Sequence, residues 1–135
     1  MADVTLPVTV TAGVNAKTRQ VALGSTVVAG RCLHLAADNL HDYAEANSSL
    51  LISTVVGISI GGGDVGQHCL IIEEGLLNNC SGLTRGVTYM LADTIATGVL
   101  MPVADQAASD WVTLIGVAIS ATVLEVGIIN SGIQQ

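Results

Sequence analysis

The chain has 135 residues, half of them hydrophobic, but only 11% are charged, and the formal net charge is −7. An ordinary soluble domain has about 25% charged residues. This composition therefore predicts a single domain whose copies bury part of one another's surface. Four Lys and Arg residues are too few to neutralise many phosphates, which argues against nucleic acids and anionic membrane surfaces as partners.

The N-terminal sequence, MADVTLPVTV, has Asp3 where a signal peptide carries Lys or Arg, and no long apolar segment follows it. The most membrane-like stretch, residues 111–129, contains Glu125 and many β-branched residues, and no Lys or Arg flanks it. We therefore expect a soluble protein that is made in the cytoplasm and does not span a membrane.

The chain opens with an alternating pattern that predicts a strand with one apolar face. The apolar positions are Val4, Leu6, Val8 and Val10. Pro7 has no N–H to donate to a neighbouring strand, so this strand should lie at a sheet edge or be exchanged with a neighbour. We interpret residues 1–23 as an N-terminal strand or arm and residues 24–135 as a β domain.

Strand patterns also dominate the rest of the chain. Residues 122–129 alternate between two faces, and no stretch of twelve residues shows a helical stripe with caps. The segment 38–46, DNLHDYAEA, could form a turn or two of helix at most. The sequence therefore predicts an all-β fold, a compact β-barrel or β-sandwich.

Three blocks of residues recur in the same order, which predicts two related halves at about 24–75 and 82–132. In the clearest pair, VVGISI matches LIGVAI around Gly57 and Gly116. The matched blocks are residues 30–36 with 86–92, 55–60 with 114–119, and 71–75 with 128–132.

Gly61 to Gly66 forms a G-x-G-x-x-G motif, which in a dinucleotide site must be followed by a helix that holds the pyrophosphate. Here the motif is followed by QHCLII, which has the composition of a strand. The other half of the repeat has Ser120-Ala121-Thr122 in its place. We therefore predict a hairpin connection and no nucleotide cofactor.

Neighbouring polar pairs do not predict catalysis. His68 and Cys69 are adjacent on a predicted strand, so their side chains point to opposite faces, and the same holds for Glu73 and Glu74. Serine, histidine and aspartate are scattered without a pattern that supports or excludes a triad. We do not expect an enzyme.

Cysteine and histidine could in principle supply a zinc site. Cys32 and His34 share a strand face, and the remaining ligands would come from His41, His68 or Cys80. No spacing requires this, and Cys32, Cys69 and Cys80 contain no CxxC motif, so we expect buried free thiols and no metal.

The second half carries motifs built from glycines and strand ends. They are GLTRGVTYML at 82–91, GVLMP at 98–102 and IGVAISAT at 115–122. This pattern resembles head decoration (capsid cement) proteins of tailed bacteriophages and related tail-fibre modules. The first half, around Gly57 and Gly75, is similar to the first half of the same arrangement, so the resemblance covers roughly residues 24–132.

The resemblance implies a structural virion protein with no cofactor, a homotrimer that binds the outside of the assembled capsid and joins neighbouring capsomers. Its partners would be the major capsid protein and its own copies. Independently of the resemblance, the N-terminal strand that carries Pro7 could reach onto a neighbouring surface, so we place the capsid contacts there: Val4, Leu6, Pro7 and Val8. We place the trimer contact on the low-charge strands near residues 112–119: Trp111, Leu114 and Val117. Trp111 and Tyr89 could equally be core residues.

Two other functions remain open at this point. The first is a phage tail or tail-fibre component that contacts a host surface, although the sequence has no collagen-like, coiled-coil or repetitive stalk. The second is a small β-barrel that binds a ligand, or an enzyme, using His34, His41 or His68.

Overall fold

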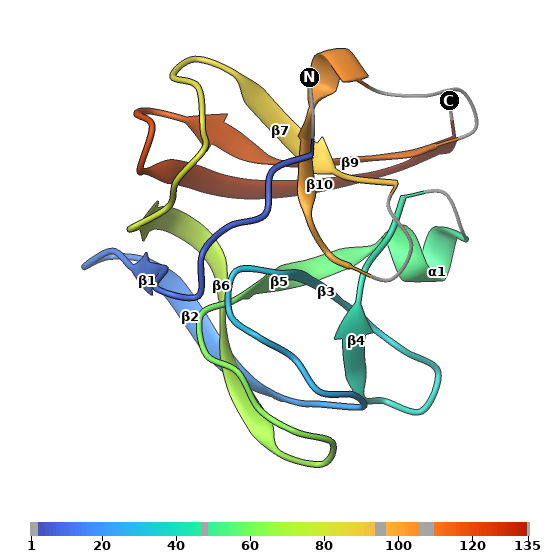
Figure 1. Ribbon diagram of the computed structural model, residues 1–135. Helices are drawn as coiled ribbons and strands as arrows, with labels where there is room; N and C mark the ends of the chain where they lie inside the picture. Colours follow the sequence, from blue (N-terminus) through green and yellow to red (C-terminus); the bar gives the residue numbers. More distant parts are fainter. Residues whose placement is uncertain (1–2, 47–48, 94–96, 106–109, 135) are drawn as a thin grey trace.

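The computed structural model describes residues 3–46, 49–93, 97–105 and 110–134, and these form an antiparallel β structure (Figure 1), which confirms the all-β prediction. The strands are β1 (Thr11–Ala12), β2 (Lys17–Ala22), β3 (Cys32–Leu35), β4 (His41–Tyr43), β5 (Val55–Ser59), β6 (His68–Asn78), β7 (Thr88–Leu91), β8 (Leu100–Pro102), β9 (Trp111–Ala118) and β10 (Leu124–Gln134). A short helix α1 (Leu50–Ser53) and a 3₁₀ turn η1 (Val103–Asp105) precede β5 and β9. The helical turn suggested for 38–46 is wrong, because β4 lies there.

The strand order of the sheet consists of two similar four-stranded units in mirror order, which meet at β6 and β10. The strands run β4-β3-β5-β6-β10-β9-β7-β8, and β1 and β2 also pair with the long strand β6. Each half therefore pairs its strands in the same way, with β6 and β10 antiparallel at the junction. Figure 1 shows the sheet strongly curled.

Residue registers within the two halves correspond as well. Leu33 pairs with Gly57, and Tyr89 pairs with Gly116. The register shifts directly after Leu33 in the first half and directly after Tyr89 in the second. The blocks 30–36 with 86–92 and 55–60 with 114–119 are therefore aligned as the sequence suggested. The third block is displaced, because Ser59 pairs with Ile71, whereas the equivalent Ala118 pairs with Leu124 rather than with Ile128.

The repeated glycine in each half lies where another strand approaches closely. A Cβ on Gly57 would lie 2.8 Å from the Ile72 carbonyl oxygen and from Ile71 Cδ1. A Cβ on Gly116 would collide with the backbone of Glu125. A side chain at either position would push the neighbouring strand away, which explains why both halves have glycine here.

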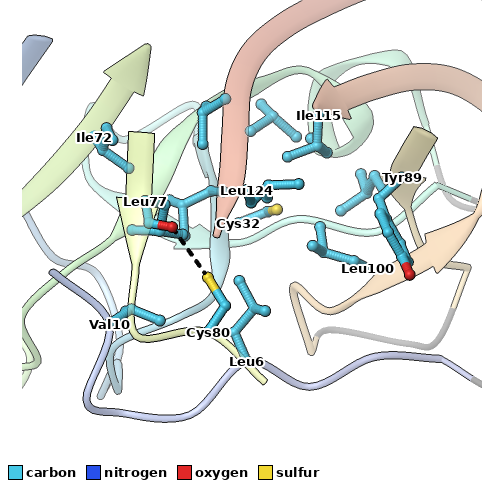
Figure 2. Close-up of a cluster of buried hydrophobic side chains, with 14 of the residues drawn as sticks. Leu6, Val10, Cys32, Ile72, Leu77, Cys80, Tyr89, Leu100, Ile115 and Leu124 are labelled. Atoms are coloured by element: carbon cyan, nitrogen blue, oxygen red, sulfur yellow. Dashed lines mark hydrogen bonds between the residues drawn. The ribbon is translucent and has the colours of Figure 1, made fainter. Parts of the chain in front are cut away.

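The interior consists of three apolar clusters. The central core joins the two halves and includes Ile58. Figure 2 shows four of its other members, Ile72, Tyr89, Ile115 and Leu124. A first-half core forms on the other side of β3, β5 and β6: Val21, Leu23, Val27, Leu33, Cys69 and Ile71. A second-half core consists of Met90, Ala92, Val99 and Met101, with the half-buried Leu114 packed against it.

The two halves turn opposite strand faces toward the central core. Leu33 belongs to the first-half core, whereas its counterpart Tyr89 belongs to the central core. Likewise Ile58 is buried in the central core and its counterpart Val117 is 40% exposed. The repeat therefore preserves strand pairing but not the burial of individual side chains.

The segment before β3 is part of the same domain. β2 pairs along β6 from Lys17 to Ala22, and Leu23 is fully buried. The predicted division into an arm over 1–23 and a domain over 24–135 therefore does not match the described residues. Residues 11–22 join the domain because β6 is long: it pairs with β5 and β10 along one edge and with β1 and β2 along the other.

The ends of the curled sheet are joined through the segment after β4. The Gly98 N–H donates to the Ala44 carbonyl at 3.1 Å, and the Ala46 N–H donates to the Ala92 carbonyl at 3.1 Å. The Ala46 carbonyl in turn accepts from the Trp111 N–H at 2.7 Å. Because backbone hydrogen bonds connect the two halves here, the arrangement is barrel-like, as one of the two sequence alternatives proposed.

Candidate functional site

The predicted capsid-contact segment is mostly anchored to the domain. The backbones of Val4 and Leu100 exchange hydrogen bonds of 2.7 and 3.0 Å, so the segment covers the outer edge of β8. Leu6 and Val10 point into the central core (Figure 2), and each is 2% exposed. The regular strand predicted for residues 4–10 is wrong, because the chain turns at Val8 and Thr9.

Of the four predicted capsid contacts, Val8 is the one that presents a large apolar surface. It is 65% exposed on the turn, while Pro7 and Val4 are half-buried. The Leu6 side chain is occupied inside the domain and is a poor candidate for contact with another protein. The sequence missed this because a buried anchor and a contact residue both appear as isolated apolar positions.

The predicted trimer-contact residues do not form one surface. Val117 is 40% exposed on β9. Leu114 packs on the second-half core and pairs with Ile129 of β10. Trp111 is half-buried near the segment before α1, where its N–H donates to Ala46. These three residues of β9 therefore lie in different surroundings.

The structure brings together an apolar groove that the sequence did not predict. It is lined by Leu35, Leu50, Leu51, Thr54 and Val56, from β3, α1 and β5. The three leucines are 40%, 48% and 51% exposed. The sequence does mark this region, because residues 46–63 contain no ionisable side chain. The local sequence does not indicate, however, that the leucines of α1 face outward.

The polar residues considered for catalysis either lie apart from one another or make structural contacts. His68 is exposed while Cys69 is buried, as expected for neighbours on a strand. The Glu73 carboxylate pairs with the Arg19 guanidinium at 3.2 Å. Both side chains are partly exposed, so this ion pair contributes little to stability. The half-buried Arg31 donates to the Thr97 carbonyl at 2.7 Å and lies 5.5 Å from the ring centre of Tyr43.

The buried histidines have backbone partners. The His34 Nδ1 lies 3.1 Å from the Tyr43 carbonyl, and the His41 Nδ1 lies 2.9 Å from the Ala22 carbonyl. These contacts position the imidazoles within β3 and β4 and use one ring nitrogen of each. Among the residues that the structure describes, no group of three His, Cys, Asp or Glu side chains could hold a metal ion.

All three cysteines are buried free thiols, as the sequence predicted. Burial raises the pKa of Cys32 to about 12 and that of Cys80 to about 11, and it also raises the pKa of Cys69. The Cys80 thiol donates to the Leu77 carbonyl at 3.4 Å (Figure 2). Thiols in this environment are protonated near neutral pH, so they are poor nucleophiles.

A scan against protein-family models and a search of curated proteins found no match for this chain. Within the described ranges, the helices are all too short or too polar to cross a membrane.

Proposed function

We propose that this protein is a structural component of a tailed-phage virion that binds the outside of the assembled capsid as a homotrimer and stabilises the head where capsomers meet. The proposal extends the resemblance of the glycine and strand-end motifs to phage decoration proteins. The compact β domain found here is the kind of fold that the resemblance implies.

One observation carries the proposal furthest. Fourteen large apolar side chains among the described residues are 37% exposed or more, although the chain has only 11% charged residues. A contiguous exposed apolar patch favours contact with other proteins, and three of these side chains, Leu35, Leu50 and Leu51, line one apolar groove. A protein that is surrounded by its copies and by a capsid shell would bury such surface.

A cement function needs no reactive residue. Each subunit would contribute modest apolar contacts, and a trimer that engages several sites at once binds far more tightly than one subunit does. The net charge of −7 is compatible with an outer position on the virion, away from the packaged DNA. The major capsid protein would be the partner.

The first test is the native mass of the purified protein by light scattering. Three chains of 13.7 kDa give about 41 kDa, as expected for closed cyclic symmetry. The second test is co-sedimentation with empty heads assembled from the capsid protein encoded in the same genome. Saturable binding that raises the temperature of head disruption supports the proposal.

Other results would assign another function. A trimer that ignores heads but binds tails or host cells would indicate a tail or fibre component. A monomer without head binding would contradict the cement function and would direct attention to a small ligand-binding barrel.

A further inference from the structure

A pocket of about 370 Å³ opens where the N-terminal segment lies beside the turn before β7. Its volume falls within the range of small-molecule sites, about 300–1,000 Å³. Tyr89 of β7 and its cross-strand partner Pro102 of β8 contribute to the pocket from the sheet. The described residues that line it are Asp3, Val4, Thr5, Ser81, Gly82, Thr84, Tyr89 and Pro102.

The Tyr89 hydroxyl is a buried donor at this pocket. The side chain is 1% exposed and its ring packs in the central core, so only its hydroxyl end reaches the pocket. Figure 2 shows the hydroxyl at the edge of the core cluster. The phenol oxygen accepts from the Thr84 N–H at 2.9 Å, and it still has its own proton to donate. In the part of the chain that the structure describes, no acceptor receives this proton.

The strand pairing does not require a phenol at this position. Tyr89 corresponds to Leu33 in the first half, and each pairs with the repeated glycine of its half, Gly116 or Gly57. Leu33 fills the first-half core without a polar atom. The hydroxyl of Tyr89 is therefore an addition of the second half, and it serves the turn before β7 and the pocket.

Three further hydroxyls surround the opening, those of the exposed residues Thr5, Ser81 and Thr84. Among the residues that the structure describes, these three side chains have no hydrogen-bond partner. Each hydroxyl can donate and accept. Asp3 adds a carboxylate, which can accept several hydrogen bonds.

These groups restrict the chemistry of a ligand. The Tyr89 proton needs an acceptor, which an ammonium group lacks. An anion would meet the Asp3 carboxylate, and no Lys, Arg or His is among the described residues that line the pocket. Hydroxyl groups both donate and accept, and the C–H face of a sugar ring matches the apolar surface of Val4 and Pro102. The pocket therefore fits a neutral polyhydroxylated molecule.

We propose that this pocket binds a neutral saccharide, with the Tyr89 hydroxyl donating to a sugar oxygen and Asp3 accepting from sugar hydroxyls. The inference goes beyond the proposed function and does not depend on it. Its failure would leave the proposed capsid function standing.

The test is an NMR titration of the isotope-labelled protein with the methyl glycosides of glucose, galactose, mannose and N-acetylglucosamine. We expect saturable shifts of the Gly82 and Thr84 amide signals, with a dissociation constant in the millimolar range. Tyr89→Phe removes only the hydroxyl oxygen and should weaken binding about fivefold, as for one lost hydrogen bond. Tyr43→Phe is the matched control and should bind like the unmodified protein, because the Tyr43 hydroxyl also accepts from a backbone N–H, that of Val28 at 3.0 Å, outside the pocket.

Three results would overturn the inference. They are the absence of shifts at sugar concentrations of tens of millimolar, shifts confined to residues outside the pocket, and equal affinity of Tyr89→Phe and Tyr43→Phe. Acetate and butylammonium are titrated as charged probes, and a stronger response to either of them than to every sugar would also contradict it.

A second variant decides the matter if Tyr89→Phe does not fold. Ser81→Trp places a large side chain at the exposed rim of the pocket, and Ala121→Trp, in the exposed turn between β9 and β10, is its control. Loss of sugar binding in Ser81→Trp alone supports the inference, and retained binding contradicts it. Polysaccharides that carry the best sugar at their chain ends are titrated in the same way. Tighter binding of the polysaccharide would identify the ligand as a glycan chain end and equal binding as the free sugar, and both support a saccharide site.

Discussion

The side-chain amide of Asn130 makes both hydrogen bonds that a neighbouring strand would offer to Val55. Its Oδ1 accepts from the Val55 N–H at 2.9 Å, and its Nδ2 donates to the Val55 carbonyl at 3.0 Å. Val55 begins β5, which pairs with β6 only further along, at Ile58 and Ser59. Asn130 thus continues the ladder across the junction of the two halves.

Asn130→Ala should lower the free energy of unfolding by about 1–3 kcal/mol, because it leaves two backbone groups of the buried Val55 without partners. Denaturant unfolding measures the effect. Asn15→Ala, in the exposed turn before β2, is the control and should change stability by less than about 0.5 kcal/mol. Equal stability of the two variants would mean that water replaces the amide at no cost.

Gly116→Ala should destabilise the protein by about 1–3 kcal/mol, because the added Cβ collides with the backbone of Glu125 and β10 must move. Gly127→Ala, in β10, is the matched control, since a Cβ there has no heavy atom within 4 Å. Thermal unfolding of both variants makes the comparison. A tolerated Gly116→Ala would show that the close approach of β9 and β10 is not needed.

Leu6→Ala should cost about 2–5 kcal/mol, because it opens a cavity in the central core. Val8→Ala, two residues away and 65% exposed, should change stability by less than about 0.5 kcal/mol. Urea unfolding distinguishes the two. An unchanged Leu6→Ala protein would mean that the N-terminal segment is a detachable arm after all.

The buried thiols predict a loss of stability at alkaline pH. Burial raises the pKa of Cys32 from 9.0 to about 12 and that of Cys80 from 9.0 to about 11. Well below pH 9.0 these thiols are protonated in the folded and unfolded chain alike. As the pH rises above 9.0, the unfolded chain loses protons that the folded one keeps, so the free energy of unfolding falls.

Urea unfolding at about pH 7.5 and about pH 10.5 measures this fall, and Cys80→Ala should reduce it. Near neutral pH, the native protein should also resist a thiol reagent such as DTNB, while the denatured chain exposes all three thiols. Rapid reaction of a folded thiol would contradict the burial of that cysteine.

Much of the architecture could be predicted before the structure. Strand composition on both sides of Gly61–Gly66 indicated a hairpin, and β5 and β6 do pair antiparallel across that turn. The glycines in the two similar blocks predicted equivalent positions, and Gly57 and Gly116 do occupy equivalent positions in their strand pairs. The candidate contact surfaces were harder to predict from the sequence. Whether a side chain on a strand is exposed depends on which elements cover that strand, and those elements come from distant parts of the chain.

The sequence by itself determined that this chain is all-β, that its halves repeat and that its cysteines are buried thiols. These properties follow from local composition and from the two-residue period of a strand. Only the tertiary structure decided that Leu33 and Tyr89 enter different cores, that Leu6 is an anchor and that α1 turns Leu50 and Leu51 outward. When both faces of a strand are apolar, the period of two does not tell which face is inside; long-range pairing does.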